Sequence, residues 1–584
     1  METNLALSAD MPSMDFWIIT ATNCSTAMTS AYTTVYSVPL GSLQGACVDV
    51  TSCGNFNTYK GASPCKYRLI DCVQYVHHNT LVIHEFDVLP EESYSAASYI
   101  WRGKPFDPSF PEQRGFFSVL GAENGDPISM DVLYHVCMAS LQKKAKLLWL
   151  DRLCIIQQSR DDKAWQIQRM YGIYKACDPC LVLPGGLQRL VCIDEETEWI
   201  QRGWTLQEMM APDDPLVLFR WRRGSGFFIG PTPFTGDLEE VVTGESALAN
   251  IMDLLLPYLG GIMGGQTYFH LDEDREPQDK EEESGIEIKP ILFGRTPSHA
   301  LALLGALWPS VRDPDAIPHA VWRSALMRVS SRPVDMVFSI MGIFDVTLDP
   351  KAFRSHDRLG ATIALAQEIL RKGGNASWLI ATMNLPPERQ LSSFPAFPTT
   401  RVDGKAQIEV DGLTRDLAEV VGGDEFLERW SLKESPKGSM NDAGYLTISS
   451  QAIRVKPVDR RTDLQSHREG QGCVCDTVRR VFFTALDSTA WEVCSENPDG
   501  VQSPCPRTFV VYVGMALANP YSSQPTLQRY IQTYTLLAIL VQEHAPGRYH
   551  RSSNLVLCHC FEKFIKSWDV RKFDIGPNMT PTQL

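Results

Sequence analysis

From about residue 94, short apolar runs alternate with amphipathic stretches. SAASYI (95–100), LLWLD (147–151) and CLVL (180–183) are continuous apolar runs, typical of strands that are buried on both faces of a parallel sheet. Between the second and third runs, four residues have the spacing of one helix face: Ile167, Met170, Tyr171 and Tyr174. Strands that alternate with helices in this way predict an α/β domain with a parallel sheet and right-handed crossovers.

The pattern changes several times along the chain, which predicts a division into separate regions. The first region is rich in Ser, Thr and Ala without periodicity, and the fourth contains several apolar helical stretches. The predicted regions are a mobile tail (1–65), an α/β domain (66–235), an irregular acidic insert (236–295), a helical extension (296–400) and a β-rich C-terminal domain (401–584).

Composition narrows the classes of function. With 44% hydrophobic and 21% charged residues, the 584-residue chain is typical of a folded globular protein. A formal charge of −15 argues against nucleic acid as a partner, because no basic excess is present to neutralise phosphates. We see no signal peptide, and the longest apolar runs are shorter than a membrane span. The sixteen cysteines are therefore interpreted as reduced thiols in a cytoplasmic protein.

The stretch WIQRGWTLQE (199–208) contains the strongest candidate acid. If the stretch is one helix, with about 100° per residue, Glu208 falls at the margin of a broad apolar arc, on the side of Trp204. Partial removal from water would raise the pKa of this carboxyl, as in an active site. The alternative is a structural glutamate at the helix edge, paired with an arginine such as Arg202 or Arg220.

Four motifs in order resemble a known family. SAASYIWRG, LLWLDRLCIIQ, QIQRMYGIYKAC and WIQRGWTLQE are together similar to the heterokaryon incompatibility (HET) domain of fungal proteins. SRPVDMVFSIMGIF (331–344) is similar to the helical segment that commonly follows that domain. The resemblance covers about residues 94–220 most clearly, extends to about 400, and does not include the C-terminal domain.

The chain departs from the family pattern at three places. Ile156 replaces the usual Asn of a Cys-Ile-Asn-Gln motif, so any polar role of that side chain is lost. The aromatic-Leu-Gly that often ends the third strand is Leu183-Pro184-Gly185 here, and Arg102 lengthens the usual Tyr-x-Trp-Gly by one residue. These changes affect the detail of a pocket more than the fold.

The resemblance implies a TIR-like fold, a flavodoxin-like parallel sheet flanked by helices. TIR domains often carry Trp-Cys-x-x-Glu on the helix after their third strand, and Trp204 and Glu208 keep that spacing. In TIR domains that cleave NAD, this glutamate is the catalytic residue. Ser98 and Tyr99 likewise resemble the Ser-Tyr of the first TIR strand.

NAD is then the implied substrate, cleaved at its nicotinamide–ribose bond through an oxocarbenium-like state that Glu208 stabilises. The predicted binding residues lie at the carboxyl ends of parallel strands or on the Glu208 helix: Ser98, Tyr99, Trp101, Asp151, Arg152 and Trp204. Tyr99, Trp101 or Trp204 would stack on a ring, Asp151 would bind a ribose hydroxyl and Arg152 a phosphate. The alternatives are that both tryptophans are core residues and that Asp151 caps the next turn.

The cysteine motifs are weaker candidates for a site. Cys177 and Cys180 have redox or zinc spacing, and Cys558-His559-Cys560 places two thiols close together. Zinc needs about four ligands, and neither motif supplies them locally. Buried free thiols are the favoured interpretation, so no metal is predicted.

Two hypotheses of different classes follow. The first is a HET-type effector of fungal non-self recognition and programmed cell death, which self-associates or binds protein partners and cleaves NAD. The second is a non-enzymatic interaction module of a signalling assembly, in which Glu208 is an ordinary charge at the margin of a helix.

Overall fold

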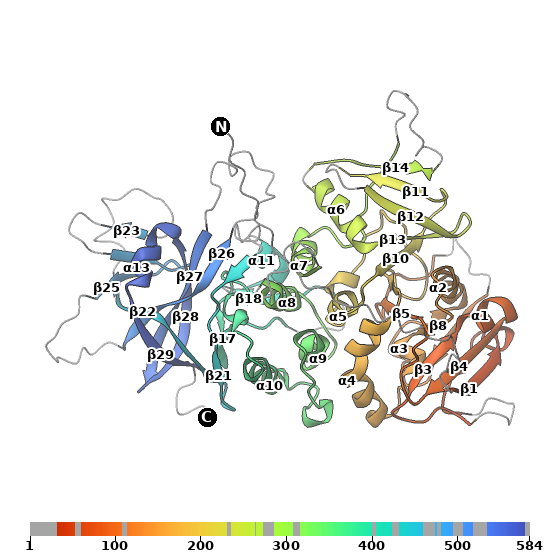
Figure 1. Ribbon diagram of the computed structural model, residues 1–584, viewed down its shortest axis with the longest axis horizontal. Helices are drawn as coiled ribbons and strands as arrows, with labels where there is room; N and C mark the ends of the chain where they lie inside the picture. The colour runs from red at the N-terminus through yellow and green to blue at the C-terminus, as the bar shows by residue number, and fades with distance from the viewer. Residues whose placement is uncertain are drawn as a thin grey trace, which may run out of the picture.

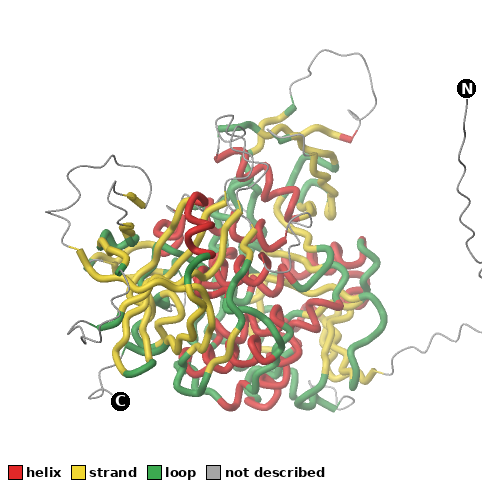
Figure 2. The backbone as a smooth tube through the Cα atoms, turned by 60° about the vertical axis from the view of Figure 1, so that its left-hand side comes forward, coloured by secondary structure: helices red, strands yellow, loops and turns green. Residues whose placement is uncertain are grey.

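The computed structural model describes residues 32–52, 60–107, 114–230, 235–262, 264–272, 285–307, 316–399, 404–410, 412–422, 431–458, 473–475, 481–494, 506–517 and 534–578. An α/β core lies at one end of the molecule, a β-rich domain lies at the other, and helices fill the middle (Figure 1). Helices also separate the strand-rich ends in the rotated view (Figure 2). The mixed α/β architecture and the β-rich C-terminal region agree with the prediction.

The core contains one mixed sheet, which has twelve strands among the described residues. Across the sheet they lie in the order β1 (Tyr32–Pro39), β4 (Thr80–Phe86), β3 (Tyr67–Asp71), β8 (Leu147–Trp149), β5 (Tyr94–Tyr99), β9 (Cys180–Leu183), β10 (Pro215–Arg220), β13 (Ser246–Asn250), β12 (Thr235–Val242), β11 (Gly226–Ile229), β14 (Thr267–Leu271) and β15 (Ile286–Ile288). A small separate sheet joins β2 (Cys47–Val48), β6 (Phe116–Val119) and β7 (Ile128–Ser129).

The four central strands, β8, β5, β9 and β10, are parallel to one another, and their neighbours on both sides are antiparallel to them. Every residue of β5, β8 and β9 is buried, which explains their continuous apolar sequences. In chain order the four strands are arranged 2-1-3-4, so the order reverses between β5 and β9. Open α/β sheets bind ligands beside such a reversal, at the carboxyl ends of the strands.

Helices connect the strands and cover the sheet. They are α1 (Cys72–His78), α2 (Met130–Gln142), α3 (Asp151–Cys154), α4 (Arg160–Ala176), α5 (Thr205–Met210) and α6 (Ile251–Ile262). Hydroxyl caps fix two of the helix starts, because Ser129 accepts from the backbone N–H of Val132 and Ser159 accepts from that of Asp162. The α4 face predicted to be apolar buries Met170 and Tyr174.

Two segments differ from the prediction. The expected tail, 1–65, contributes β1, which pairs with β4 and buries Val35 and Tyr36. The expected irregular insert, 236–295, contains β13, β14, β15, α6 and most of β12, which extend the sheet beyond β10 by antiparallel pairing. The pairings of β1 with β4 and of β13 with β10 join segments that are separated in the chain, so local periodicity does not reveal them. Most of the acidic run, 273–284, lies outside the described residues.

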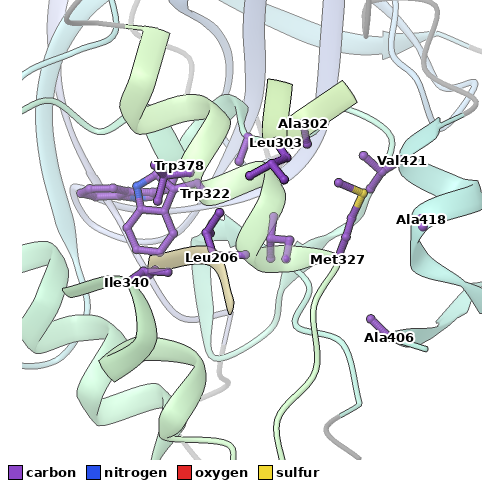
Figure 3. Close-up of a cluster of buried hydrophobic side chains, with 14 of the residues drawn as sticks. Leu206, Ala302, Leu303, Trp322, Met327, Ile340, Trp378, Ala406, Ala418 and Val421 are labelled. Carbon is purple, nitrogen blue, oxygen red and sulfur yellow. The ribbon is translucent and has the colours of Figure 1, made fainter. Parts of the chain in front are cut away.

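The helical middle follows the core. Its main elements are α7 (Pro297–Leu307), α8 (Ala316–Leu326), α9 (Asp335–Met341), α10 (Arg358–Arg371), α11 (Leu417–Gly422) and the short strand pairs β16 (Pro387–Glu388) with β17 (Leu391–Pro395) and β18 (Gln407–Val410) with β19 (Leu413–Asp416). One apolar cluster runs from β10 through these helices into the C-terminal sheet. Figure 3 shows part of this cluster around Leu206, Trp322 and Trp378.

The C-terminal domain is a second, largely antiparallel sheet. Its strands are β20 (Ser431–Lys433), β26 (Thr508–Leu517), β27 (Tyr534–Ala545), β28 (Arg548–Cys558), β29 (Asp569–Ile575), β22 (Leu446–Val458), β25 (Ala490–Val493), β24 (Val481–Thr484) and β23 (Cys473–Cys475), with β21 (Gly438–Met440) paired to β22. A short helix, α13 (Glu562–Lys566), lies before β29. Within the described part of the chain, we find no helix with the length and apolar character needed to cross a bilayer.

The packing of α4 against the helical middle can be tested at Gly342. A Cβ at this position would lie 2.3 Å from the Cβ of Tyr171, so the two segments approach too closely for a side chain. We expect Gly342→Ala to lower the free energy of unfolding by about 1–3 kcal/mol through overpacking. Gly172→Ala is the matched control, because Gly172 lies in α4 with no heavy atom near its Cβ direction, and it should be neutral or add about 0.5–1 kcal/mol. Urea unfolding measures both effects, and equal stability of the two variants would contradict the packing.

Candidate active site

The predicted acid, Glu208, is held inside the protein by a short chain of hydrogen bonds. Ser98 Oγ, near the carboxyl end of β5, donates to Glu208 Oε2 over 2.6 Å, and the indole Nε1 of Trp199 donates to Ser98 Oγ over 3.0 Å. Glu208 is 7% exposed, whereas Ser98 and Trp199 are completely buried. The contact therefore joins α5 to the central strand in an environment from which water is excluded.

The backbone around Glu208 differs from the single helix that the sequence suggested. Trp199–Gln201 form one 3-10 turn, Arg202 has an extended conformation, and α5 begins only at Thr205. The break changes the direction in which the later residues point. Glu208, expected at the margin of an apolar arc, is consequently buried with Leu206 and Met209.

Burial raises the pKa of Glu208 from 4.5 to about 8. Desolvation is the largest cause, and the nearby carboxylate of Asp151 raises the pKa further. The hydroxyl of Ser98, the positive charge of Arg328 and a hydrogen bond with Tyr174 act in the opposite direction. Tyr174 OH also donates to the carbonyl oxygen of Ala97, over 2.9 Å, which ties this tyrosine to β5 beside Ser98.

A second group of predicted residues surrounds Asp151, at the carboxyl end of β8. Its carboxylate accepts hydrogen bonds from Tyr99 OH and, over 2.9 Å, from Trp101 Nε1, and it also accepts from the backbone N–H of Arg152. Burial raises the pKa of Asp151 despite these three donors. The structure thus brings Ser98, Tyr99, Trp101, Asp151 and Glu208 together at adjacent strand ends.

Arg152 and Trp204 point to other parts of the molecule. Arg152 is 1% exposed and donates to the backbone carbonyl oxygens of Asp126 and Ala122, with its guanidinium 5.7 Å from the centre of the Trp101 ring. The half-buried Trp204 contacts the apolar clusters of both the core and the helical middle, and it shares a hydrogen bond with Asp335. Each side chain therefore has a structural role in this conformation.

Two loops close the edge of the sheet at the strand-order reversal. The backbone N–H of Lys104 donates to the carbonyl oxygen of Gly185 over 2.8 Å. A Cβ on Gly103 would lie 2.0 Å from that same oxygen, so only glycine permits the approach. The segments that follow β5 and β9 are consequently held against each other at the carboxyl ends of these strands.

Three residues of the site were not predicted as site residues: Trp199, Tyr174 and Arg328. Trp199 and Tyr174 were expected only as apolar helix positions, and their polar atoms gave no separate signal. Arg328 follows α8, 120 residues after Glu208 in the chain, and no motif marks it. Only the three-dimensional packing of the helical middle against α5 identifies it.

The cysteine motifs do not form a metal site among the residues that can be examined. Cys177 and Cys180 are buried free thiols. Across the described ranges, no three His, Cys, Asp or Glu side chains are grouped so that they could hold a metal ion. Cys558 is half-buried and Cys560 is exposed, while the side chains of Cys473 and Cys475 lie outside the described residues.

A comparison with known protein families gives a match to part of this core. Residues 94–190 match the family model of the Heterokaryon incompatibility protein (HET). The match begins at the first residue of β5 and includes β8, α4, β9 and five of the predicted site residues, and it ends before Glu208. It supports a heterokaryon incompatibility domain in this chain. No curated protein and no solved structure gives a significant match.

The raised pKa of Glu208 predicts a specific dependence of stability on pH. Between its unfolded pKa of 4.5 and its folded pKa of about 8, the folded state binds one proton more than the unfolded state. Its contribution is complete below 4.5 and is lost as the pH rises towards about 8, by roughly 1.4 kcal/mol per pH unit.

Glu208→Gln removes this titration, so its stability relative to the wild type should increase across that pH range. Urea unfolding at a series of pH values measures the difference. Glu91→Gln, at an exposed position before β5, is the control and should show no such trend. If the difference in unfolding free energy between Glu208→Gln and the wild type stays constant with pH, the pKa of Glu208 is not raised.

Proposed function

We propose that the chain is a heterokaryon-incompatibility-type effector of fungal non-self recognition and cell death, and that its core cleaves the nicotinamide–ribose bond of NAD. The observation that carries the proposal is the environment of Glu208: a buried carboxyl, bonded to Ser98, with a pKa of about 8. A pKa close to the working pH is what acid–base catalysis requires. Strongly perturbed carboxyls of this kind concentrate at functional sites.

The strand order supports a TIR-like, flavodoxin-like core. The 2-1-3-4 arrangement of β8, β5, β9 and β10 is the start of the flavodoxin order. Glu208 lies on α5, the helix after the third parallel strand, where the resemblance to TIR domains expects the catalytic glutamate. This part of the proposal rests on analogy of fold and position.

In the proposed reaction, an ionised Glu208 stabilises the oxocarbenium-like state as the nicotinamide leaves with the bonding electron pair. Water then adds to the ribose carbon and gives its proton to the Glu208 carboxylate. Tyr99 and Trp101 offer ring surface beside Asp151, which would bind a ribose hydroxyl once its donors separate. A role for Arg152 at a phosphate requires the loop 122–126 to move, because that loop holds its N–H groups.

The competing proposal is a non-enzymatic interaction module. The observation that favours it is the 7% exposure of Glu208, because a substrate cannot reach a carboxyl that is covered in this way. In that case the Ser98–Glu208 contact serves the packing of α5 against β5. The enzymatic proposal therefore requires a second, more open conformation.

The test is NAD consumption by the full chain, at high protein concentration and with a crowding agent to favour self-association. We expect nicotinamide release by the wild type and by Glu91→Gln, and a loss of about 10²–10⁴-fold in Glu208→Gln. No release from a folded, self-associating protein would favour the interaction module. Equal release from Glu208→Gln and wild type would mean that another residue carries the reaction.

A further inference from the structure

The backbone before α5 is paired with a segment that lies far away in the chain. Val329 N–H donates to the carbonyl oxygen of Gln201 over 2.7 Å, and Gly203 N–H donates to the carbonyl oxygen of Val329 over 2.8 Å. Arg202 and Val329 thereby form a parallel bridge outside the named strands. The helical middle thus holds the extended residue that interrupts the predicted helix.

Arg328 continues this attachment with its side chain. Its Nη1 donates to the carbonyl oxygen of Arg202 over 3.0 Å and to Thr205 Oγ1 over 2.7 Å, and its Nε donates to Ser324 Oγ over 3.2 Å. Arg328 is completely buried. Because Thr205 is the first residue of α5, the guanidinium fixes the start of the helix that carries Glu208.

Apolar side chains also pack at this contact between α5 and the helical middle. Leu206, which is completely buried, reaches from α5 towards Trp322 and Ile340 of the helical middle (Figure 3). A Cβ on Gly203 would lie 3.2 Å from the Sδ of Met336, so the side chain of Met336 packs directly on the backbone of Gly203. Residues 322–340 therefore cover α5 on the side that faces away from the sheet; we call them the cover segment.

The contact surface between α5 and the cover segment, which we call the seam, contains buried polar atoms that lack hydrogen-bond partners in the described part of the chain. Within the described residues, its buried polar atoms without a hydrogen-bond partner include Gln201 Oε1, Arg328 Nη2 and Trp322 Nε1. Each such atom costs about 1–3 kcal/mol. This cost lowers the stability of the closed seam relative to an open one in which water reaches these atoms.

We propose that the cover segment is an intramolecular latch on Glu208, and that Arg328 is the positioning residue through which it acts. With the latch closed, α5 is fixed by its bonds to Val329 and Arg328, and Glu208 is excluded from solvent. Release of the 199–205 backbone from Val329 and Arg328 frees α5 to turn, so that Glu208 reaches water and ionises. The latch itself is inferred from the seam alone. Its effect on NAD cleavage rests on the proposed function.

A reversible covalent lock tests the latch. Paired positions on adjacent backbones lie within the span of a disulfide, so R202C/V329C should form a bond across the bridge. We expect the oxidised full chain to slow hydrogen exchange of the Gly203 amide by at least about tenfold, equal to ~1.4 kcal/mol. The same lock should abolish nicotinamide release, and a reductant should restore both. Each single-cysteine variant, oxidised in parallel, controls for the native thiols.

A release variant gives the opposite expectation. Arg328→Gln is too short to reach both Arg202 and Thr205, so exchange at Gly203 should become at least about tenfold faster while the amides of β26 and β27 are unchanged. Arg354→Gln is the matched control, because Arg354 is exposed and lies outside the cover segment.

The outcomes separate the two proposals. The latch would be overturned if the Gly203 amide of the wild type exchanges only by global unfolding. It would also be overturned if the locked protein continues to release nicotinamide. A lock that slows exchange in a protein that never releases nicotinamide would support the latch and contradict the proposed reaction.

Discussion

The candidate site depends on one hydrogen bond, from Ser98 of β5 to Glu208 of α5, made where water is excluded. In water such a bond would contribute little, because both partners could exchange it for solvent. Here the carboxyl has only protein partners, so burial raises its pKa to about 8 and makes its charge sensitive to any opening. The position of α5, the protonation of Glu208 and the access of a ligand are consequently parts of one equilibrium.

The surroundings explain why this equilibrium favours the closed form. The carboxylate of Asp151, which accepts hydrogen bonds from Tyr99 and Trp101, places a like charge near Glu208. Arg328, from the helical middle, places an opposite charge near it. Burial of the Arg328 guanidinium lowers its pKa to about 9, and the negative charge of Glu208 acts in the opposite direction. Apolar packing around Leu206 offsets these electrostatic costs. If α5 moved away from the helical middle, apolar contacts would be lost while the charges of Glu208 and Arg328 would become hydrated.

Local patterns in the sequence predicted the part of the fold that local physics decides. The apolar runs located β5, β8 and β9, and the spacing from Ile167 to Tyr174 located α4. Glu208 stood out by its apolar neighbours and by the Trp204 spacing. The break at Arg202–Gly203 and the role of Arg328 were not predictable, because both depend on pairing with residues more than 120 positions away. Non-local pairing also explains why β1 was missed, since it pairs with β4, and why β13 was missed, since it pairs with β10 across two intervening strands.

The central claim, that Glu208 is a neutral acid in the closed protein, is tested most directly by infrared spectroscopy. The difference spectrum between wild type and Glu208→Gln isolates the carbonyl stretch of this one carboxyl. We expect a protonated carboxyl band at neutral pH that disappears with a midpoint of about 8. A band that disappears with the ordinary midpoint near 4.5, leaving an ionised group at neutral pH, would contradict the account.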